Sequence, residues 1–164
     1  MKKPVFTFII SILCLSAFAQ IDSTQQYYKS PFIPTFNLRK VPDSSSFVNK
    51  MLQPNKPTIL VFFDPDCDHC QHATKELTEK MDQLKDVQIL MVTVMDFKRT
   101  QKFYVDYKIA NFPNITMTRD GGFDLPRFYK VGSIPDVYVY DKNGELKGHF
   151  KNKIPVEDIA VLFQ

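Results

Sequence analysis

Two apolar segments, residues 58–63 and 88–95, restrict the folds that this chain can adopt. In neither segment do apolar and polar side chains alternate, which is typical of strands buried on both faces in a parallel sheet. From Cys67 onward the pattern changes, because apolar side chains then recur every three or four residues, as on one face of a helix. These side chains are Cys70, Ala73, Leu77, Met81 and Leu84. A strand, a helix and a strand in this order predict a βαβ unit with a right-handed crossover.

The rest of the chain predicts the other elements of an α/β fold. We expect a short edge strand at 35–38, a short helix at 44–52, a helix at 97–107 and mostly loop at 108–122. We also expect a helical turn at 125–129, strands at 137–140 and 146–150, and a last helix opening at Pro155. The Asn143-Gly144 pair is a strong hairpin signal, so the last two strands should pair antiparallel. The prediction is a mixed central β-sheet flanked by helices.

Residues 1–19 have the three-part build of a secretory signal peptide. Two lysines are followed by an apolar run at 5–15 and then by the small-x-small pattern that ends at Ala19. The run is short for a membrane-spanning helix, which needs about 20 apolar residues. We expect cleavage after Ala19, which would remove Cys14. Retention of the segment as a membrane anchor is the alternative.

The chain after this segment predicts one exported domain. Residues 20–31 are polar and are expected to be a flexible lead-in to a domain at 32–164. The Met-Lys-Lys start favours a bacterial periplasm. The whole sequence of 164 residues is 44% hydrophobic and 24% charged, as is ordinary for one soluble domain.

The charge pattern argues against a nucleic-acid partner. The net charge is only +3, and lysines stand among acids, as in Lys75-Glu76 and Glu79-Lys80. Such a mixed surface provides no basic patch for phosphates. We expect a monomer that binds no nucleic acid and uses no cofactor.

Cys67 and Cys70 are the only cysteines that remain after the predicted cleavage, and an exported protein lies where disulfides form. A bridge between them closes a very small loop and constrains the unfolded chain little, so the pair is suited to opening and closing. Cys67 follows a buried strand at the start of a helix, where free N–H groups and the helix dipole stabilise a thiolate. We predict Cys67 as the nucleophile toward a partner disulfide, Cys70 as the resolving thiol, and a Cys67–Cys70 disulfide in the oxidised protein.

Two segments carry a resemblance to a known family. Residues 58–70, which end in Cys67-Asp68-His69-Cys70, resemble the strand, turn and active-site helix of thioredoxin-like proteins. Residues 132–144, which contain Ile134-Pro135, are similar to the second signature of that family. The resemblance implies a thioredoxin-like fold with a cis peptide before Pro135, packed against the cysteine pair. It also implies that the backbone of Ile134 pairs with an extended substrate segment.

The N-terminal extension and the insert between Met95 and Val131 resemble the envelope (TlpA/ResA-like) group within that family. Membership of this group implies a periplasmic thiol-disulfide oxidoreductase that acts on protein disulfides, with a lean toward reduction. Its partners would be proteins with exchangeable disulfides or thiols, and a membrane or periplasmic electron donor would recharge it.

The motif departs from the family pattern at positions that tune the thiolate. Asp66 stands where an aromatic residue is usual, and Asp68-His69 where Gly-Pro is frequent. Val61 stands where thioredoxin has a buried acid, so another group or water must accept protons. A histidine at position 69 favours the thiolate and makes a better oxidant, whereas Asp64, Asp66 and Asp68 disfavour the thiolate. The direction of electron flow therefore stays open.

A metal site is the first rival interpretation of these residues. Cys67, His69, Cys70 and His72 match zinc or copper ligands in type. They are too crowded on one turn and the start of a helix to converge on one ion, so no metal site is predicted.

Two other rivals share the predicted fold. A peroxiredoxin needs a threonine or serine three residues before the reactive cysteine, where this chain has Asp64. A non-catalytic binding module would tolerate the loss of either cysteine, yet Cys67 and Cys70 are both present. An insulin-reduction assay separates such a module from an oxidoreductase.

Overall fold

A computed structural model describes residues 31–163 of the protein. The predicted signal peptide and all but the last residue of the predicted lead-in lie outside this described part. Within it, no helix combines the length and the apolar character needed to cross a membrane.

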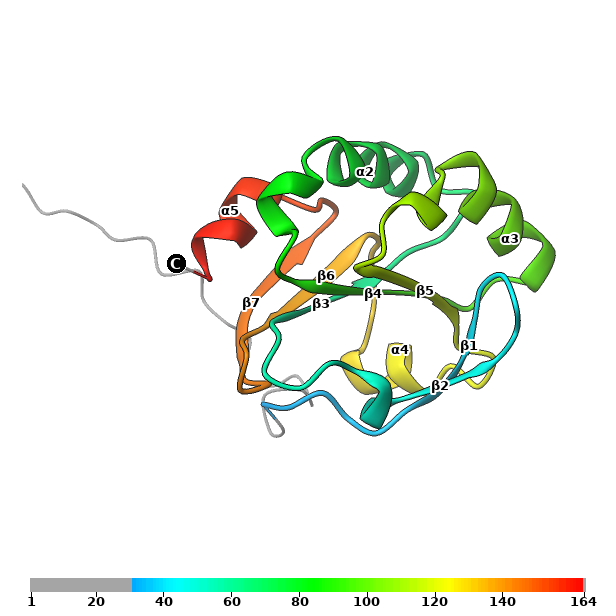
Figure 1. The fold of residues 1–164 in the computed structure, drawn as a ribbon. Coiled ribbons are helices and arrows are strands. Elements are labelled where there is room, and N and C mark those ends of the chain that lie inside the picture. The colour runs from blue at the N-terminus through cyan, green and yellow to red at the C-terminus, as the bar shows by residue number, and fades with distance from the viewer. Residues whose placement is uncertain (1–30, 164) are drawn as a thin grey trace, which may run out of the picture.

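One mixed sheet of seven strands organises the described residues (Figure 1), in the order β2-β1-β5-β4-β3-β6-β7. The strands are β1 (Asn37–Lys40), β2 (Ser46–Val48), β3 (Thr58–Phe62), β4 (Gln88–Thr93), β5 (Ile115–Arg119), β6 (Asp136–Tyr140) and β7 (Leu146–Lys151). The central strands β3, β4 and β5 are parallel, and β6, β7, β1 and β2 complete the sheet through antiparallel pairs. The predicted βαβ unit and the predicted hairpin are both confirmed.

Helices cover both faces of the sheet. The α-helices are α2 (Asp68–Glu79), α3 (Phe97–Asp106), α4 (Asp124–Tyr129) and α5 (Val156–Val161). Short 3₁₀ helices are η1 (Asn49–Met51), η2 (Met81–Leu84) and η3 (Ile109–Asn111). In Figure 1, α2 and α3 lie above the sheet and α4 lies below it. The predicted class, a mixed sheet flanked by helices, is confirmed.

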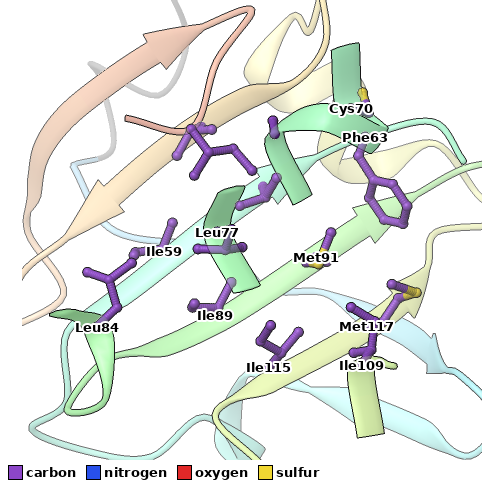
Figure 2. Packing of buried hydrophobic residues seen from close by; sticks show 14 of the residues in the cluster. Ile59, Phe63, Cys70, Leu77, Leu84, Ile89, Met91, Ile109, Ile115 and Met117 are labelled. Atoms are coloured by element: carbon purple, nitrogen blue, oxygen red, sulfur yellow. The ribbon is translucent and has the colours of Figure 1, made fainter. Parts of the chain in front are cut away.

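The larger core lies between the sheet and the face covered by α2, α3 and α5. Leu77 of α2 is fully buried against sheet residues such as Ile59 and Ile89. Figure 2 shows Leu77 in this cluster, together with Phe63 and Cys70 at the end of β3 and the start of α2. Full burial of a leucine side chain contributes about 2 kcal/mol to folding, so the helical spacing seen in the sequence anchors α2. The anchored helix holds Cys70 in the core and leaves Cys67 near its edge.

A second core lies between the sheet and α4. Leu125 and Tyr129 of α4 pack there against Phe62, Tyr138 and Tyr140 of the sheet. Side chains of β6 therefore alternate between the two faces, because Val137 and Val139 belong to the α2 side.

Two sequence predictions are wrong. Residues 44–52 do not form a helix but contain β2 and η1, because Phe47 pairs with Leu38 of β1 across the sheet. Residues 108–122 are not mostly loop, because β5 lies there and pairs with both β4 and β1. The structure also has a cis peptide bond between Val41 and Pro42, which no sequence pattern indicated.

Candidate active site

Three chain segments meet at one edge of the sheet, where β3 and β4 end and β6 begins. Phe62, the last residue of β3, pairs with Val92 of β4 and with Asp136, the first residue of β6. The turn that carries Cys67 follows β3, α3 follows β4, and Pro135 directly precedes β6. Carboxyl ends of parallel strands are where α/β proteins commonly build their sites.

The turn between β3 and α2 is held by its own hydrogen bonds. The backbone N–H of Asp66 donates to the Asp64 carboxylate at 2.8 Å, and the N–H of Cys67 donates to the Asp64 carbonyl at 3.2 Å. The Gln71 side chain donates to the carbonyl of Pro65 at 2.9 Å. These bonds fix the backbone that carries Cys67.

Cys67 is the N-cap residue of α2, and no side chain caps the first N–H groups of that helix. The N-cap is where an oxygen normally accepts a hydrogen bond from these groups. The half-buried Cys67 occupies this N-cap position, so its thiolate would lie at the positive end of the helix dipole. The local geometry suits Cys67 to act as a nucleophile.

Cys70 has a different environment one turn further along α2. Its side chain is only 1% exposed, and both cysteines are free thiols. Burial raises the pKa of the Cys70 thiol to about 12. A backbone hydrogen bond from Asp64 opposes this rise, whereas the Cys67 sulfur and the Asp64 carboxylate add to it. Cys70 therefore keeps its proton at neutral pH, and it is more deeply buried than the half-buried Cys67.

The two residues between the cysteines are exposed. Within residues 31–163 the ring of His69 has no hydrogen-bond partner. Asp68 lies close enough to Tyr107 to act on it, because burial, then Asp106 and Asp68, raise the pKa of Tyr107. Tyr107 stacks on Phe103, which in turn contacts Phe63 at the end of β3. These aromatic ring contacts thus connect α3 to the segment that directly follows β3 and leads to Cys67.

The peptide bond between Ile134 and Pro135 is cis, the geometry that the family resemblance implies. Ile134 and Cys67 both pack against the core on the α2 side, and the Pro135 carbonyl accepts a hydrogen bond from the N–H of Asn152 at 2.7 Å. Among the described residues, no hydrogen bond engages the backbone N–H or carbonyl of Ile134. That backbone is available to an extended peptide at the same sheet edge as the cysteines.

Sequence reasoning missed one charged residue of this edge. Arg99 of α3 donates from Nη1 to the Asp66 carboxylate at 2.7 Å, and its Nε donates to the carboxylate of Asp96. Asp66, predicted only as a tuning acid, is thus half of an ion pair. The available signal was the order of elements, which places the residues after β3 beside those after β4.

Sequence reasoning also missed a buried carboxylate that pairs with a half-buried histidine on the opposite face of the sheet. Asp136 is 1% exposed and lies 2.6 Å from Nε2 of His149, and it accepts a hydrogen bond from the Tyr138 hydroxyl at 3.2 Å. Val61, at the position of the thioredoxin acid, is fully buried on the α2 side. Asp136 therefore does not replace that acid beneath Cys70.

The four thiol and imidazole groups considered as metal ligands do not gather. Across residues 31–163, no three histidine, cysteine or acidic side chains lie close enough together to hold a metal ion.

Comparisons with known proteins place the chain in a family. The profile of the thioredoxin-like domain family matches residues 48–163. Curated protein sequences give no match. Among solved structures, a secreted disulfide oxidoreductase of Mycobacterium tuberculosis, homologous to DsbE of Escherichia coli, has 19% identity and a TM-score of 0.64, covering 77% of this chain and 92% of that one.

Two further structures share the fold. Mycobacterial DsbF has 20% identity and a TM-score of 0.65, covering 77% of this chain and 91% of that one. StoA of Bacillus subtilis has 18% identity and a TM-score of 0.59, covering 80% of this chain and 98% of that one. At these identities the likeness concerns the fold. Together with the family match over residues 48–163, it shows that the chain belongs to the thioredoxin-like family.

Proposed function

We propose that this protein is a thiol-disulfide oxidoreductase that acts on disulfides of other proteins. The observation that carries the proposal is the inequality of its two thiols. Cys67 is accessible at the start of α2, whereas Cys70 is buried and its pKa is raised to about 12. A half-buried, partly accessible attacking thiol followed by a protonated, buried second thiol is the arrangement that two-step exchange needs.

The exchange proceeds in two displacements. The Cys67 thiolate attacks one sulfur of the partner disulfide, and the other partner sulfur leaves as a thiolate that takes a proton. Cys70 then loses its proton and attacks the Cys67 sulfur, which releases the second partner thiolate. The partner gains two electrons and two protons, and the protein ends with a Cys67–Cys70 disulfide.

In the second step, the buried Cys70 thiol must lose its proton before it can attack. Asp64 acts on Cys70 in two ways, through a hydrogen bond from its backbone and through the charge of its carboxylate. Once a mixed disulfide forms, Cys67 no longer carries a charge that opposes ionisation of Cys70. The second thiol is therefore easier to deprotonate after the first step than before it.

The cis-proline edge gives the substrate a place to bind. The unengaged backbone of Ile134 would pair with an extended partner segment, as in β-strand addition, and bring its disulfide toward Cys67. Main-chain pairing is largely indifferent to side chains, which suits an enzyme that accepts several protein substrates.

We infer that the protein is exported and that it acts as a reductase. The predicted signal peptide at residues 1–19 and the secreted mycobacterial structure with this fold both favour an exported protein, most simply in a bacterial periplasm. Asp66, Asp68 and His69 would tune the thiolate, and the acids favour a reductase. A membrane or periplasmic dithiol donor would return the oxidised pair to its thiol form.

Trapping tests the exchange. Cys70→Ser should accumulate covalent complexes with partner proteins through Cys67, since the resolving thiol is gone. Cys67→Ser, the matched control, should give none, because Cys70 is buried. The wild type should also reduce insulin disulfides with dithiothreitol as donor. Absence of trapped complexes together with absence of insulin reduction would refute the exchange and leave a binding module.

Equilibration of the Cys67/Cys70 pair with glutathione tests the direction. A potential near about −270 mV, the thioredoxin value, supports a reductase, and one near about −120 mV would show an oxidant instead.

A further inference from the structure

Arg99 is a basic side chain that lies at the same edge of the sheet as the turn that carries Cys67. Among the described residues, it is the only lysine or arginine that forms an ion pair with the segment from Asp64 to Cys70. Its Nη1 reaches the carboxylate of Asp66, the residue directly before Cys67, at 2.7 Å. The two residues are 33 positions apart, so the contact exists only because β3 and β4 are neighbours in the sheet.

The guanidinium is held in place by its own helix. Asp96, the N-cap of α3, accepts a hydrogen bond from the backbone N–H of Arg99 at 3.0 Å and a second one from its Nε. Hydrogen bonds with Asp96, and then with Asp66, raise the pKa of Arg99. One side of the planar fork is thus fixed by Asp96, and the next N–H group of the fork is left to reach Asp66.

The ion pair between Arg99 and Asp66 is important because most of the charged side chains near Cys67 in the sequence are acidic. The turn and the start of α2 contribute the carboxylates of Asp64, Asp66 and Asp68 within five residues, together with His69. A carboxylate close to a thiol disfavours the thiolate form of that thiol. From α3 come the Asp96 carboxylate and the Arg99 guanidinium. Loss of Arg99 would leave the carboxylate of Asp66, the residue directly before Cys67, without its ion pair.

We propose that Arg99 is a positioning residue for thiol exchange: it neutralises and fixes Asp66, and so favours the thiolate of Cys67. The inference rests on the proposed function for its meaning, but the reactivity of Cys67 can be measured without any partner protein. The role is electrostatic, so it should weaken when salt screens the exposed charges.

Alkylation of reduced protein by iodoacetamide tests this, with the Cys67 peptide quantified by mass spectrometry across pH. In Arg99→Met, the pH of half-maximal alkylation should rise by about half a unit, and the rate at pH 7 should fall about three-fold. Lys102→Met is the matched control, because Lys102 lies on the same helix and pairs at 2.5 Å with Asp106, which is not a residue of the segment from Asp64 to Cys70. It should behave as the wild type.

A second substitution separates charge from structure. Asp66→Asn in the Arg99→Met background should restore the wild-type alkylation midpoint, since the acid that Arg99 neutralises directly before Cys67 is then gone. A midpoint in Arg99→Met equal to that of Lys102→Met would overturn the proposal, and so would failure of Asp66→Asn to restore it. Failure of the exchange itself would appear separately, as absence of trapped partners with the alkylation shift intact.

Discussion

Asp136, the first residue of β6, interacts with several neighbouring groups. It follows the Ile134–Pro135 peptide, pairs with Phe62 in the sheet, and is buried with the Tyr138 hydroxyl and the His149 ring. A buried carboxylate is tolerated only where donors satisfy it, and here the strand hairpin supplies them. The start of β6 is thereby tied to β7.

Replacement of this carboxylate should destabilise the fold measurably. Asp136→Ala removes an acceptor from the buried Tyr138 hydroxyl and from the half-buried His149 ring, and we expect a loss of about 2–4 kcal/mol in the free energy of unfolding. Tyr138→Phe removes one hydroxyl from the same group and should cost about 1 kcal/mol. Urea unfolding of both variants checks this. Equal costs for the two would show that the carboxylate contributes nothing beyond that hydroxyl's bond.

At the scale of elements, the β6–β7 hairpin depends on one glycine. Gly144 has φ +80°, and its N–H donates to the Asp141 carbonyl at 2.9 Å to close the turn. A Cβ added there would meet Phe32 at 3.6 Å, an ordinary contact, so the cost of a side chain is conformational. Left-handed backbone costs a residue with a Cβ about 1–2 kcal/mol.

Gly144→Ala should therefore lower the free energy of unfolding by about 1 kcal/mol, measured by chemical denaturation. Asn143→Ala, the neighbouring control, keeps its backbone hydrogen bond to Asp141 and should change stability by less than about 0.5 kcal/mol. A Gly144→Ala protein as stable as the control would show that the turn adopts another conformation.

Elements with strong local patterns were predictable, and β5 was not. Residues 115–119 contain two threonines and an arginine, which gave the segment the character of a loop. The Thr118 hydroxyl is buried, and it donates to the carbonyl of Met91 in the adjacent strand at 3.0 Å. A polar residue satisfied by a neighbouring strand cannot be distinguished locally from a solvated one.

The predicted helix at 44–52 failed for a related reason. Its serines resemble helix caps, but Ser45 instead donates its N–H to the Asp43 side chain at 3.0 Å and forms a turn. Phe47 then packs on Phe36, from before β1. Tertiary pairing with β1 decided the structure of this segment, and a single-sequence pattern contains no information about that strand.

The residues of the candidate site also differ in whether a local sequence pattern could identify them. Cys67, Cys70 and Pro135 lie in short segments whose residues carry their own signature, so the sequence sufficed to single them out. Arg99 and Asp66 interact through the adjacency of β3 and β4. Because no local pattern encodes that adjacency, the ion pair became visible only in three dimensions.

At the scale of the whole molecule, the state of one buried thiol is coupled to folding. The pKa of Cys70 is raised from 9.0 to about 12 in the folded protein, chiefly by burial. Below pH 9 the thiol is protonated in both the folded and the unfolded state, so its ionisation does not affect stability. Above pH 9 the unfolded chain releases this proton and the folded protein keeps it. Stability must therefore fall as pH rises from 9 toward 12.

The fall is measurable in a background that contains no disulfide. Cys67→Ser and the double variant Cys67→Ser/Cys70→Ala differ only in the buried thiol of Cys70. Cys67→Ser keeps that thiol buried, and burial is the largest cause of its raised pKa. Between pH 8 and pH 10, the stability of Cys67→Ser should fall by about 1.4 kcal/mol more than that of the double variant. Tyrosines and lysines titrate in both proteins, so their contributions cancel in the difference. Urea unfolding under reducing conditions at both pH values gives the two free energies. A difference that stays constant across this range would mean that Cys70 ionises as readily in the core as in the unfolded chain, and the two thiols would then lose the inequality on which two-step exchange depends.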